Sequence, residues 1–254
     1  PVDLLDVAGL VEGASEGKGL GNQFLSDLTN ADALIHIVDV SGETDEEGKE
    51  TKDYNPVQDV KMLENELDLW YLGILKKVWK IFARTMQQTK QEFAGAVATQ
   101  FSGLKVNEED VKHVVLKLGY DSEKPSEWND EQLMGFAHEL RHVSTPMIIA
   151  ANKIDKPNAK ENLDNLKKAY PELIIIPCSA DSELALREAS NHGLIEYVPG
   201  EAGFKIKGDK INEKQKQALD LIQKNVFSKN AIVHQLLDFQ VRNMHQRQSL
   251  GQYS

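Results

Sequence analysis

The sequence predicts an α/β fold into which a long all-helical segment is inserted. Two observations predict it. Short apolar runs, each followed by a loop, occur at residues 2–7, 33–40, 147–151 and 173–177. Residues 56–143, between the second and third runs, instead carry apolar residues three and four apart. Near-continuous apolar runs are typical of strands buried in a parallel sheet, whereas the second spacing is typical of amphipathic helices.

The first 55 residues are expected to alternate between strand and loop or helix. Residues 2–7 predict a short strand, and residues 8–21 are rich in glycine, which predicts a loop whose backbone is open to a ligand. Residues 23–30 predict a short helix. Residues 33–40 predict a strand buried on both faces, and residues 41–55 an exposed acidic connection.

The inserted segment is expected to form three helices, at residues 56–101 with a break near Gly95, at 108–118 and at 130–143. Asn55 and Asn107 are suited to cap the first two, because a short amide side chain can accept a hydrogen bond from the first helical turn. Gly119 suits the end of the second helix.

The α/β pattern resumes after the insertion. Expected elements are a strand at 147–151, a helix at 160–169, a strand at 173–177, a helix at 182–190, a strand fragment at 204–207 and helices at 213–226 and 229–243. We therefore expect four regions: residues 1–55 and 144–200 as two parts of one α/β domain, 56–143 as a helical insertion, and 201–254 as a helical extension.

Composition and net charge exclude several classes of protein. The 254 residues have 41% hydrophobic and 27% charged content, which is ordinary for a soluble globular protein, and no apolar run is long enough to cross a bilayer. A formal net charge of −11 argues against wrapping nucleic acid by bulk charge. The single cysteine, Cys178, excludes an internal disulfide framework, and we interpret it as a small core residue.

The four residues Asn152-Lys153-Ile154-Asp155 follow the apolar run at 147–151 and suit a guanine-reading loop. The Asp155 carboxylate can accept from both N1–H and the 2-amino group of guanine, a pair of donors that adenine lacks. The Lys153 stem can lie along the base, and Asn152 can brace the loop.

Two further strand ends carry matching chemistry. Asp6 ends the first apolar run and can hold Mg²⁺ through a water, while Gly9 lets a backbone N–H approach a terminal phosphate. Ser179 and Ala180 follow the run at 173–177 and can present a backbone N–H to guanine O6. The order along the chain, first magnesium and phosphate, then base, then base support, is the order that GTPases use.

With these motifs in place, residues 6–25 (Asp-Val-Ala-Gly-Leu-Val-Glu-Gly onward) resemble the switch II segment of the Obg family of translation-associated GTPases, and residues 31–42 are also similar. The long helical insertion resembles the YchF/Obg-like ATPase branch. The resemblance implies a G domain of the P-loop NTPase type, with a mostly parallel sheet, that binds and hydrolyses GTP with Mg²⁺. It also implies a cytoplasmic protein that associates with the ribosome or its RNA.

The chain departs from the family pattern in two ways. It contains no G-x-x-x-x-G-K-[ST] phosphate loop and no recognisable TGS domain, so we expect an internal fragment that binds nucleotide poorly by itself. In the family fold the missing first strand lies between those equivalent to residues 2–7 and 33–39, and its loss would leave a gap or a rearranged sheet. Leu10 occupies the place of a water-orienting glutamine, and the catalytic group is not identified.

Alternatives follow from the same residues. Other members of the branch lack Asn-Lys-x-Asp and favour ATP, so the motif here implies the archaeal-type, GTP-preferring group, with an ATP-preferring hydrolase as one alternative. A second is a non-enzymatic module that binds partners through its helices. A dinucleotide-dependent oxidoreductase is excluded by the absence of a suitable G-x-G-x-x-G. His138 and His142 are spaced like a metal pair, but without an evident third ligand we interpret them as a solvated face.

Overall fold

The computed structural model describes residues 3–7, 13–14, 27–28, 30–199, 201, 203–207 and 211–227. The chain divides into two compact units, and each is considered by itself. The sheet unit contains residues 35–60 and the described residues from 147 onward; the helical unit contains the described residues up to 34 together with 61–146.

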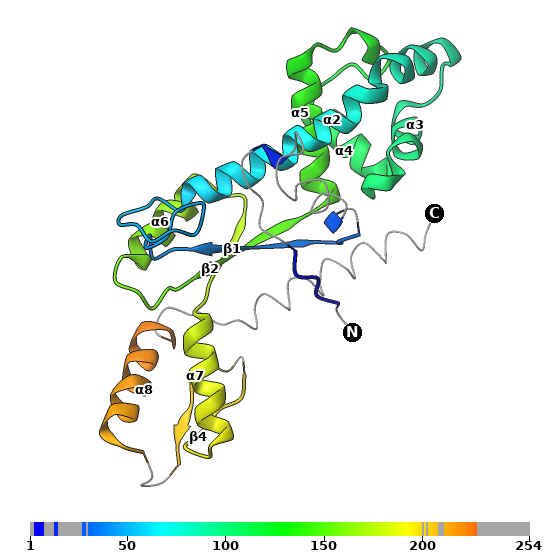
Figure 1. The fold of residues 1–254 in the computed structure, drawn as a ribbon. Coiled ribbons are helices and arrows are strands. Elements are labelled where there is room, and N and C mark those ends of the chain that lie inside the picture. Colours follow the sequence, from blue (N-terminus) through cyan, green and yellow to red (C-terminus); the bar gives the residue numbers. More distant parts are fainter. Residues whose placement is uncertain are drawn as a thin grey trace. The chain divides into compact units, whose positions relative to one another are not determined.

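The sheet unit is built on three strands in the order β1 (Leu34–Asp39), β2 (Met147–Asn152) and β3 (Ile174–Pro177) (Figure 1). β2 and β3 are parallel, with Ile149 opposite Ile175. Leu34 N donates to Pro146 O and Val40 N to Asn152 O, so β1 runs in the same direction as β2. The predicted parallel sheet is therefore confirmed, and its strands end at one edge.

Helix α6 (Ala159–Ala169) packs its apolar residues, including Leu163 and Leu166, against Ile149 and other residues of one sheet face. The opposite face carries a smaller cluster that includes Ile148 and the buried thiol of Cys178. Cys178 is thus a core residue, as expected, and burial raises its pKa to about 11. Further elements of this unit are α7 (Ala180–Asn191), β4 (Ile195–Glu196), the antiparallel β5 (Lys205–Ile206) and α8 (Glu213–Asn225).

The helical unit holds most of α2 (Val57–Thr89), together with α3 (Phe93–Gln100), α4 (Glu108–Leu118) and α5 (Asp130–Ser144), and two short 3₁₀ turns at Ser102–Leu104 and Pro125–Glu127. Figure 1 shows α3, α4 and α5 gathered around the C-terminal half of α2. Their shared core is rich in aromatic rings: Trp79, Phe93, Trp128 and Phe136 lie within van der Waals reach of one another, with ring centroids 5.2–6.3 Å apart. Aromatic pairs in such geometries contribute to the stability of the core beyond the area that they bury.

The predicted helix ends are confirmed where residues next to the helix determine them. Asn107, the expected cap, forms a capping box with the third residue of α4, and Gly119 ends α4 with a left-handed backbone. Asn129, which was not predicted as a cap, forms a capping box at the start of α5. The predicted break near Gly95 is wrong: the chain turns at Lys90, whose φ is +53°, and Gly95 lies inside α3. Glu92, which accepts from two backbone N–H groups, starts α3 there.

Two strand predictions need correction. Residues 3–7 form no strand, and Leu4 and Leu5 are 70% and 65% exposed, because in the described part of the chain no neighbouring strand pairs with them. β1 is also not buried on both faces: it lies at the end of the described sheet, and Ile37 is 68% exposed. The short β4 was not predicted, and the predicted helix at 229–243 lies outside the described residues.

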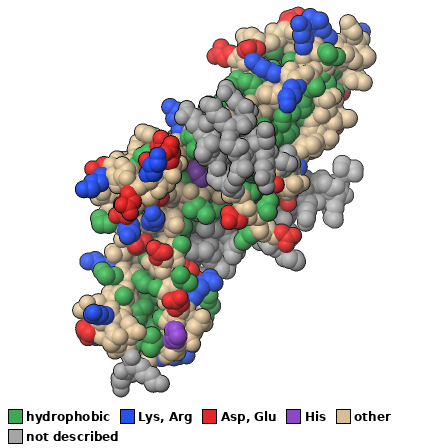
Figure 2. Space-filling model, viewed as in Figure 1, with side chains coloured by type: hydrophobic (Ala, Val, Ile, Leu, Met, Phe, Trp, Pro, Cys, Tyr) green, Lys and Arg blue, Asp and Glu red, His purple; other side chains and the backbone are tan. Residues whose placement is uncertain are grey.

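The surface carries charges of both signs. On the face shown in Figure 2, acidic and basic side chains are interspersed rather than separated by sign. None of the described helices combines the length and the apolar content that crossing a membrane requires.

Candidate nucleotide-binding site

The loops after β2 and β3 are held side by side by backbone hydrogen bonds. Cys178 N donates to Ala151 O at 2.9 Å, and Ile154 N donates to Cys178 O at 3.1 Å. Between these contacts Lys153 has a φ of +62°, a left-handed conformation that is uncommon for a residue with a side chain. The turn reverses the chain directly after β2, so that Asn152 and Asp155 lie in the same loop, next to the start of α7.

Asp155 and Ser179 are in direct contact. Ser179 Oγ donates to Asp155 Oδ1 at 2.6 Å, and the same hydroxyl accepts from Ser182 N at 3.3 Å, as the N-cap of α7. Ser179 is buried, whereas Asp155 is half-buried. Asp155 Oδ2 has no hydrogen bond to any described residue, so one oxygen is fixed and the other is available. This arrangement sets the direction of the carboxylate before any ligand binds.

Asn152 braces the second loop, because its Oδ1 accepts from Ala180 N at 3.0 Å. Ala180 itself is exposed. The N–H that we expected to offer to guanine O6 therefore has a protein partner, which a base would have to share or replace. This contact joins the end of β2 to the start of α7, and the bracing of a base-reading loop by Asn152 stays a prediction.

Lys153 contacts a residue that the sequence reasoning missed. Its Nζ donates to Asp39 Oδ2 at 2.7 Å, at the end of β1. Asp39 also accepts from Ser41 and Thr44. Burial alone would raise the pKa of Asp39, but the hydrogen bonds from Lys153, Ser41 and Thr44 outweigh it, and the pKa is lowered from its ordinary value. The available signal was position, since Asp39 ends a strand whose carboxyl end lies at the ligand edge of such sheets.

The residues expected to bind magnesium and phosphate belong to another part of the chain. Asp6 is exposed and lies in the described segment 3–7 of the helical unit. Gly9 lies outside the described residues. At the edge of the sheet the structure brings together five of the predicted residues: Asn152, Lys153, Asp155, Ser179 and Ala180. It also places Asp39, which was not predicted, in contact with Lys153.

The comparisons with known proteins agree with this geometry. The family model described as "Obg-like GTPase YGR210-like, G4 motif-containing domain" matches residues 150–246, which include both loops. The model described as "50S ribosome-binding GTPase" matches residues 1–66.

Individual relatives point the same way. An uncharacterized GTP-binding protein of Methanocaldococcus jannaschii is 47% identical over 223 residues, which cover 88% of this chain and 56% of that protein. The ribosome-binding ATPase YchF of Bacillus subtilis is 30% identical over 72% of this chain and 49% of that protein. The crystal structure of a GTP binding protein from Pyrococcus horikoshii matches with a TM-score of 0.63 and 40% identity, over 80% of this chain and 59% of that one.

The chain thus spans about half the length of the curated relatives that it matches. The parallel sheet, the position of the loops at its edge and the match to a GTP binding protein structure show a G domain of the P-loop type. On the two family models and these relatives, the chain belongs to the Obg/YchF-like family of GTPases.

Proposed function

We propose that this chain provides the base-binding loops of a GTP-binding switch protein that hydrolyses GTP, with Asp155 as the residue that selects guanine. The observation that supports it best is the 2.6 Å hydrogen bond from Ser179 Oγ to Asp155 Oδ1. It holds one carboxylate oxygen at the exposed start of α7 and leaves the other for the donors of the base. A carboxylate in that position favours guanine, because adenine would leave it unpaired.

The neighbouring residues have supporting roles in this proposal. Asn152 keeps the Ala180 loop against the end of β2, so that the two loops move as one. Lys153 flanks the base with its aliphatic stem, while Asp39 fixes its ammonium group. The Ala180 N–H donates to guanine O6 when the base is bound. Without the base it donates to Asn152 Oδ1.

Magnesium and the phosphates involve the segment that holds Asp6 and Gly9. Asp6 is an exposed single carboxylate, and this donor set fits Mg²⁺, which keeps several waters and takes one or two protein carboxylates. In the proposal Asp6 holds the ion through a water and the Gly9 N–H binds a terminal phosphate. When bound, the ion neutralises charge on the phosphates.

The partner of the switch is the ribosome or its RNA, in the cytoplasm. Support comes from the match to the ribosome-binding GTPase model and from the ribosome-binding ATPase named among the relatives. The terminal phosphate orders the segment after Gly9, and hydrolysis releases it. Because the net charge is −11, the contact is a local one and not one of bulk charge. Co-sedimentation of the full-length protein with ribosomes, with GTP and with GDP, measures this part directly.

The test of base selection compares GTP, ATP and xanthosine triphosphate by isothermal titration on the full-length protein. We expect GTP to bind most tightly. Replacing Asp155→Asn removes charge-assisted hydrogen bonds of about 1.5–3 kcal/mol, so GTP affinity falls roughly 10- to 100-fold, while xanthosine triphosphate binding improves. Asp164→Asn, an exposed carboxylate on α6, is the matched control and leaves all three affinities unchanged.

Two outcomes would overturn parts of the proposal. Preference for ATP, or unchanged discrimination in Asp155→Asn, removes the assigned role of Asp155 and favours the ATP-preferring alternative. Normal binding without magnesium-dependent release of phosphate in the full-length protein points to the non-enzymatic module.

A further inference from the structure

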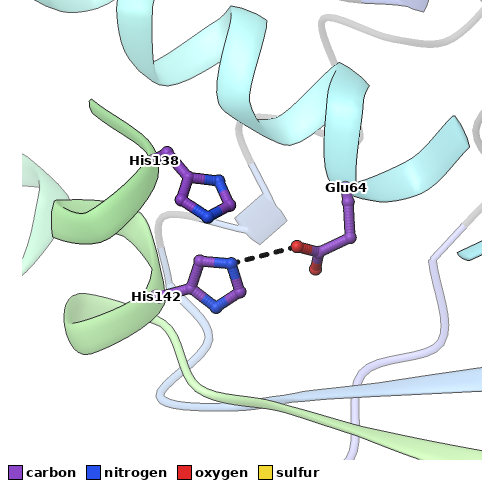
Figure 3. A group of neighbouring side chains, drawn as sticks. All are labelled: Glu64, His138 and His142. Carbon is purple, nitrogen blue, oxygen red and sulfur yellow. Dashed lines mark ion pairs between the residues drawn. The ribbon is translucent and has the colours of Figure 1, made fainter. Parts of the chain in front are cut away.

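Three potential metal ligands converge within the helical unit, whereas the loops that we assign to the nucleotide belong to the sheet unit. Figure 3 shows Glu64 on α2 facing His138 and His142 on α5. One ligand atom from each residue lies within 4.8 Å of the other two. The two imidazole rings have centroids 4.4 Å apart, and His142 Nε2 is 3.0 Å from Glu64 Oε2. The third candidate ligand, which was not evident from the sequence, is Glu64 on α2.

The orientation of His138 is fixed by a second carboxylate. His138 Nδ1 lies 2.6 Å from Asp68 Oδ2, one turn along α2 from Glu64. A carboxylate accepts from the N–H of this nitrogen, which leaves Nε2 with its lone pair directed away from Asp68. Histidines that ligate metals in proteins commonly have this kind of partner, which sets both tautomer and ring direction.

Glu64 retains an oxygen for coordination. Its Oε2 accepts from Arg141 Nη2 at 2.6 Å, whereas Oε1 is buried and has no hydrogen bond to a described residue. A buried carboxylate oxygen without a partner is costly, and a cation would satisfy it.

A metal ion at this position must coexist with the positive charge of Arg141, which contacts Glu64, Asp68 and His142. Arg141 donates through Nε to Asp68 Oδ1 at 2.7 Å, in addition to Glu64, so two carboxylates face one guanidinium. Its Nη2 also lies 2.8 Å from His142 Nε2. Coordination through that nitrogen replaces its contacts with Arg141 Nη2 and with Glu64 Oε2, while Arg141 keeps its ion pair with Asp68. With neutral histidines, the carboxylates outnumber the fixed positive charge, and this favours a divalent ion.

We propose that Glu64, His138 and His142 bind a divalent transition metal ion that links α2 to α5. Two imidazoles and one carboxylate are a donor set of zinc and of its neighbours cobalt, nickel and copper, not of calcium or magnesium. Three protein ligands leave a fourth position of a tetrahedral site for water. Bound metal would hold the two helices together independently of nucleotide.

The test is the affinity of the full chain for Zn²⁺, measured by isothermal titration after removal of any polyhistidine tag. We expect one ion per chain. His142→Gln and His138→Gln bind at least 10-fold more weakly, and Asp68→Asn, which only orients a ligand, loses about 10- to 100-fold. The matched control is His113→Gln, because His113 is an exposed histidine on α4 and its loss leaves the affinity unchanged.

A second measurement separates a ligand from a merely structural histidine. Co²⁺ bound to the unaltered chain shows the absorption of a tetrahedral site, and His142→Cys adds a thiolate-to-cobalt charge-transfer band in the near ultraviolet. Absence of stoichiometric Zn²⁺ or Co²⁺ binding by the unaltered chain overturns the proposal, as does equal affinity in His142→Gln and His113→Gln. The spectrum of the unaltered chain decides the matter even if the histidine variants fail to fold.

Discussion

The helical unit and the sheet unit each contain a polar network, and the two differ in what they leave available. In the helical unit the Arg141 side chain is 2% exposed and is paired with Glu64 and Asp68. Burial alone would raise the pKa of Glu64, but the His142 hydrogen bond and the Arg141 charge lower it to about 2. In the sheet unit Asp155 is half-buried, with one oxygen fixed by Ser179 and one available.

The difference shows how the same types of polar and charged side chain serve two purposes. A multiply paired ion network around the buried Arg141 joins α2 to α5, and removing one member leaves the others uncompensated. A loop network that is half open fixes the direction of a carboxylate and keeps it accessible to a ligand. The first network is therefore expected to control stability and the second to control binding, and the following substitutions test that division.

The largest effect is expected from Arg141→Met. The change leaves the partly buried Glu64 and Asp68 without their cation, and we expect the free energy of unfolding to fall by about 3–5 kcal/mol. Arg187→Met is the matched control, because Arg187 makes an ion pair of the same 2.7 Å length with Glu183 but is 52% exposed, and such pairs contribute under about 1 kcal/mol. Urea denaturation in metal-free buffer measures both. Equal losses in the two variants would remove burial as the distinguishing factor.

An intermediate effect is expected from Ser179→Ala in the sheet unit. The hydroxyl caps α7 and binds Asp155, so its loss costs about 1–2 kcal/mol of stability. It also releases the Asp155 carboxylate, and GTP affinity should weaken together with stability. Ser190→Ala, near the end of the same helix, is the control and should change neither. A variant that loses stability but keeps full GTP affinity would show that the Ser179 contact does not orient the base-reading carboxylate.

The smallest effect is the pH dependence that comes from Asp39. Its pKa in the folded protein lies below the ordinary value of 3.8, so its contribution to stability is present above that pH and is lost as the pH falls through the lowered value. Asp39→Asn should therefore lose less stability than the unaltered chain between about pH 5 and about pH 3. Asp164→Asn should behave like the unaltered chain. If the free energy of unfolding falls with the same slope against pH in all three proteins, other carboxyl groups cause the loss of stability in acid.

The sequence allowed the prediction of those features that depend on neighbouring residues. Asn107 caps α4 through a bond to a residue three positions away, so the bounds of α4 could be predicted closely. Lys90 could not be found in this way, because a lysine in a left-handed conformation has no local signal, whereas Gly95 offered a misleading one. Residues 3–7 failed as a strand because a strand requires a paired neighbour, which the local pattern does not specify.

The same distinction between local and long-range signals applies to the candidate sites. Asn152, Asp155 and Ser179 could be proposed because each follows an apolar run, and the parallel sheet brings its strand ends to one edge. Asp39 was missed because its contact with Lys153 joins residues 114 positions apart. Glu64 was missed for the same reason, since nothing near His138 and His142 in the sequence identifies the helix that faces them.

The central claim is that the loops at 152–155 and 179–180 form one guanine-binding surface, and amide NMR of the chain tests it most directly. Titration with GDP at millimolar concentration detects weak binding as well as tight binding. We predict shifts of the Ala180 and Asp155 amide signals with GDP, much smaller shifts with ADP, and loss of this difference in Asp155→Asn. Equal shifts with the two nucleotides, or shifts that leave both loops unaffected, would contradict the account.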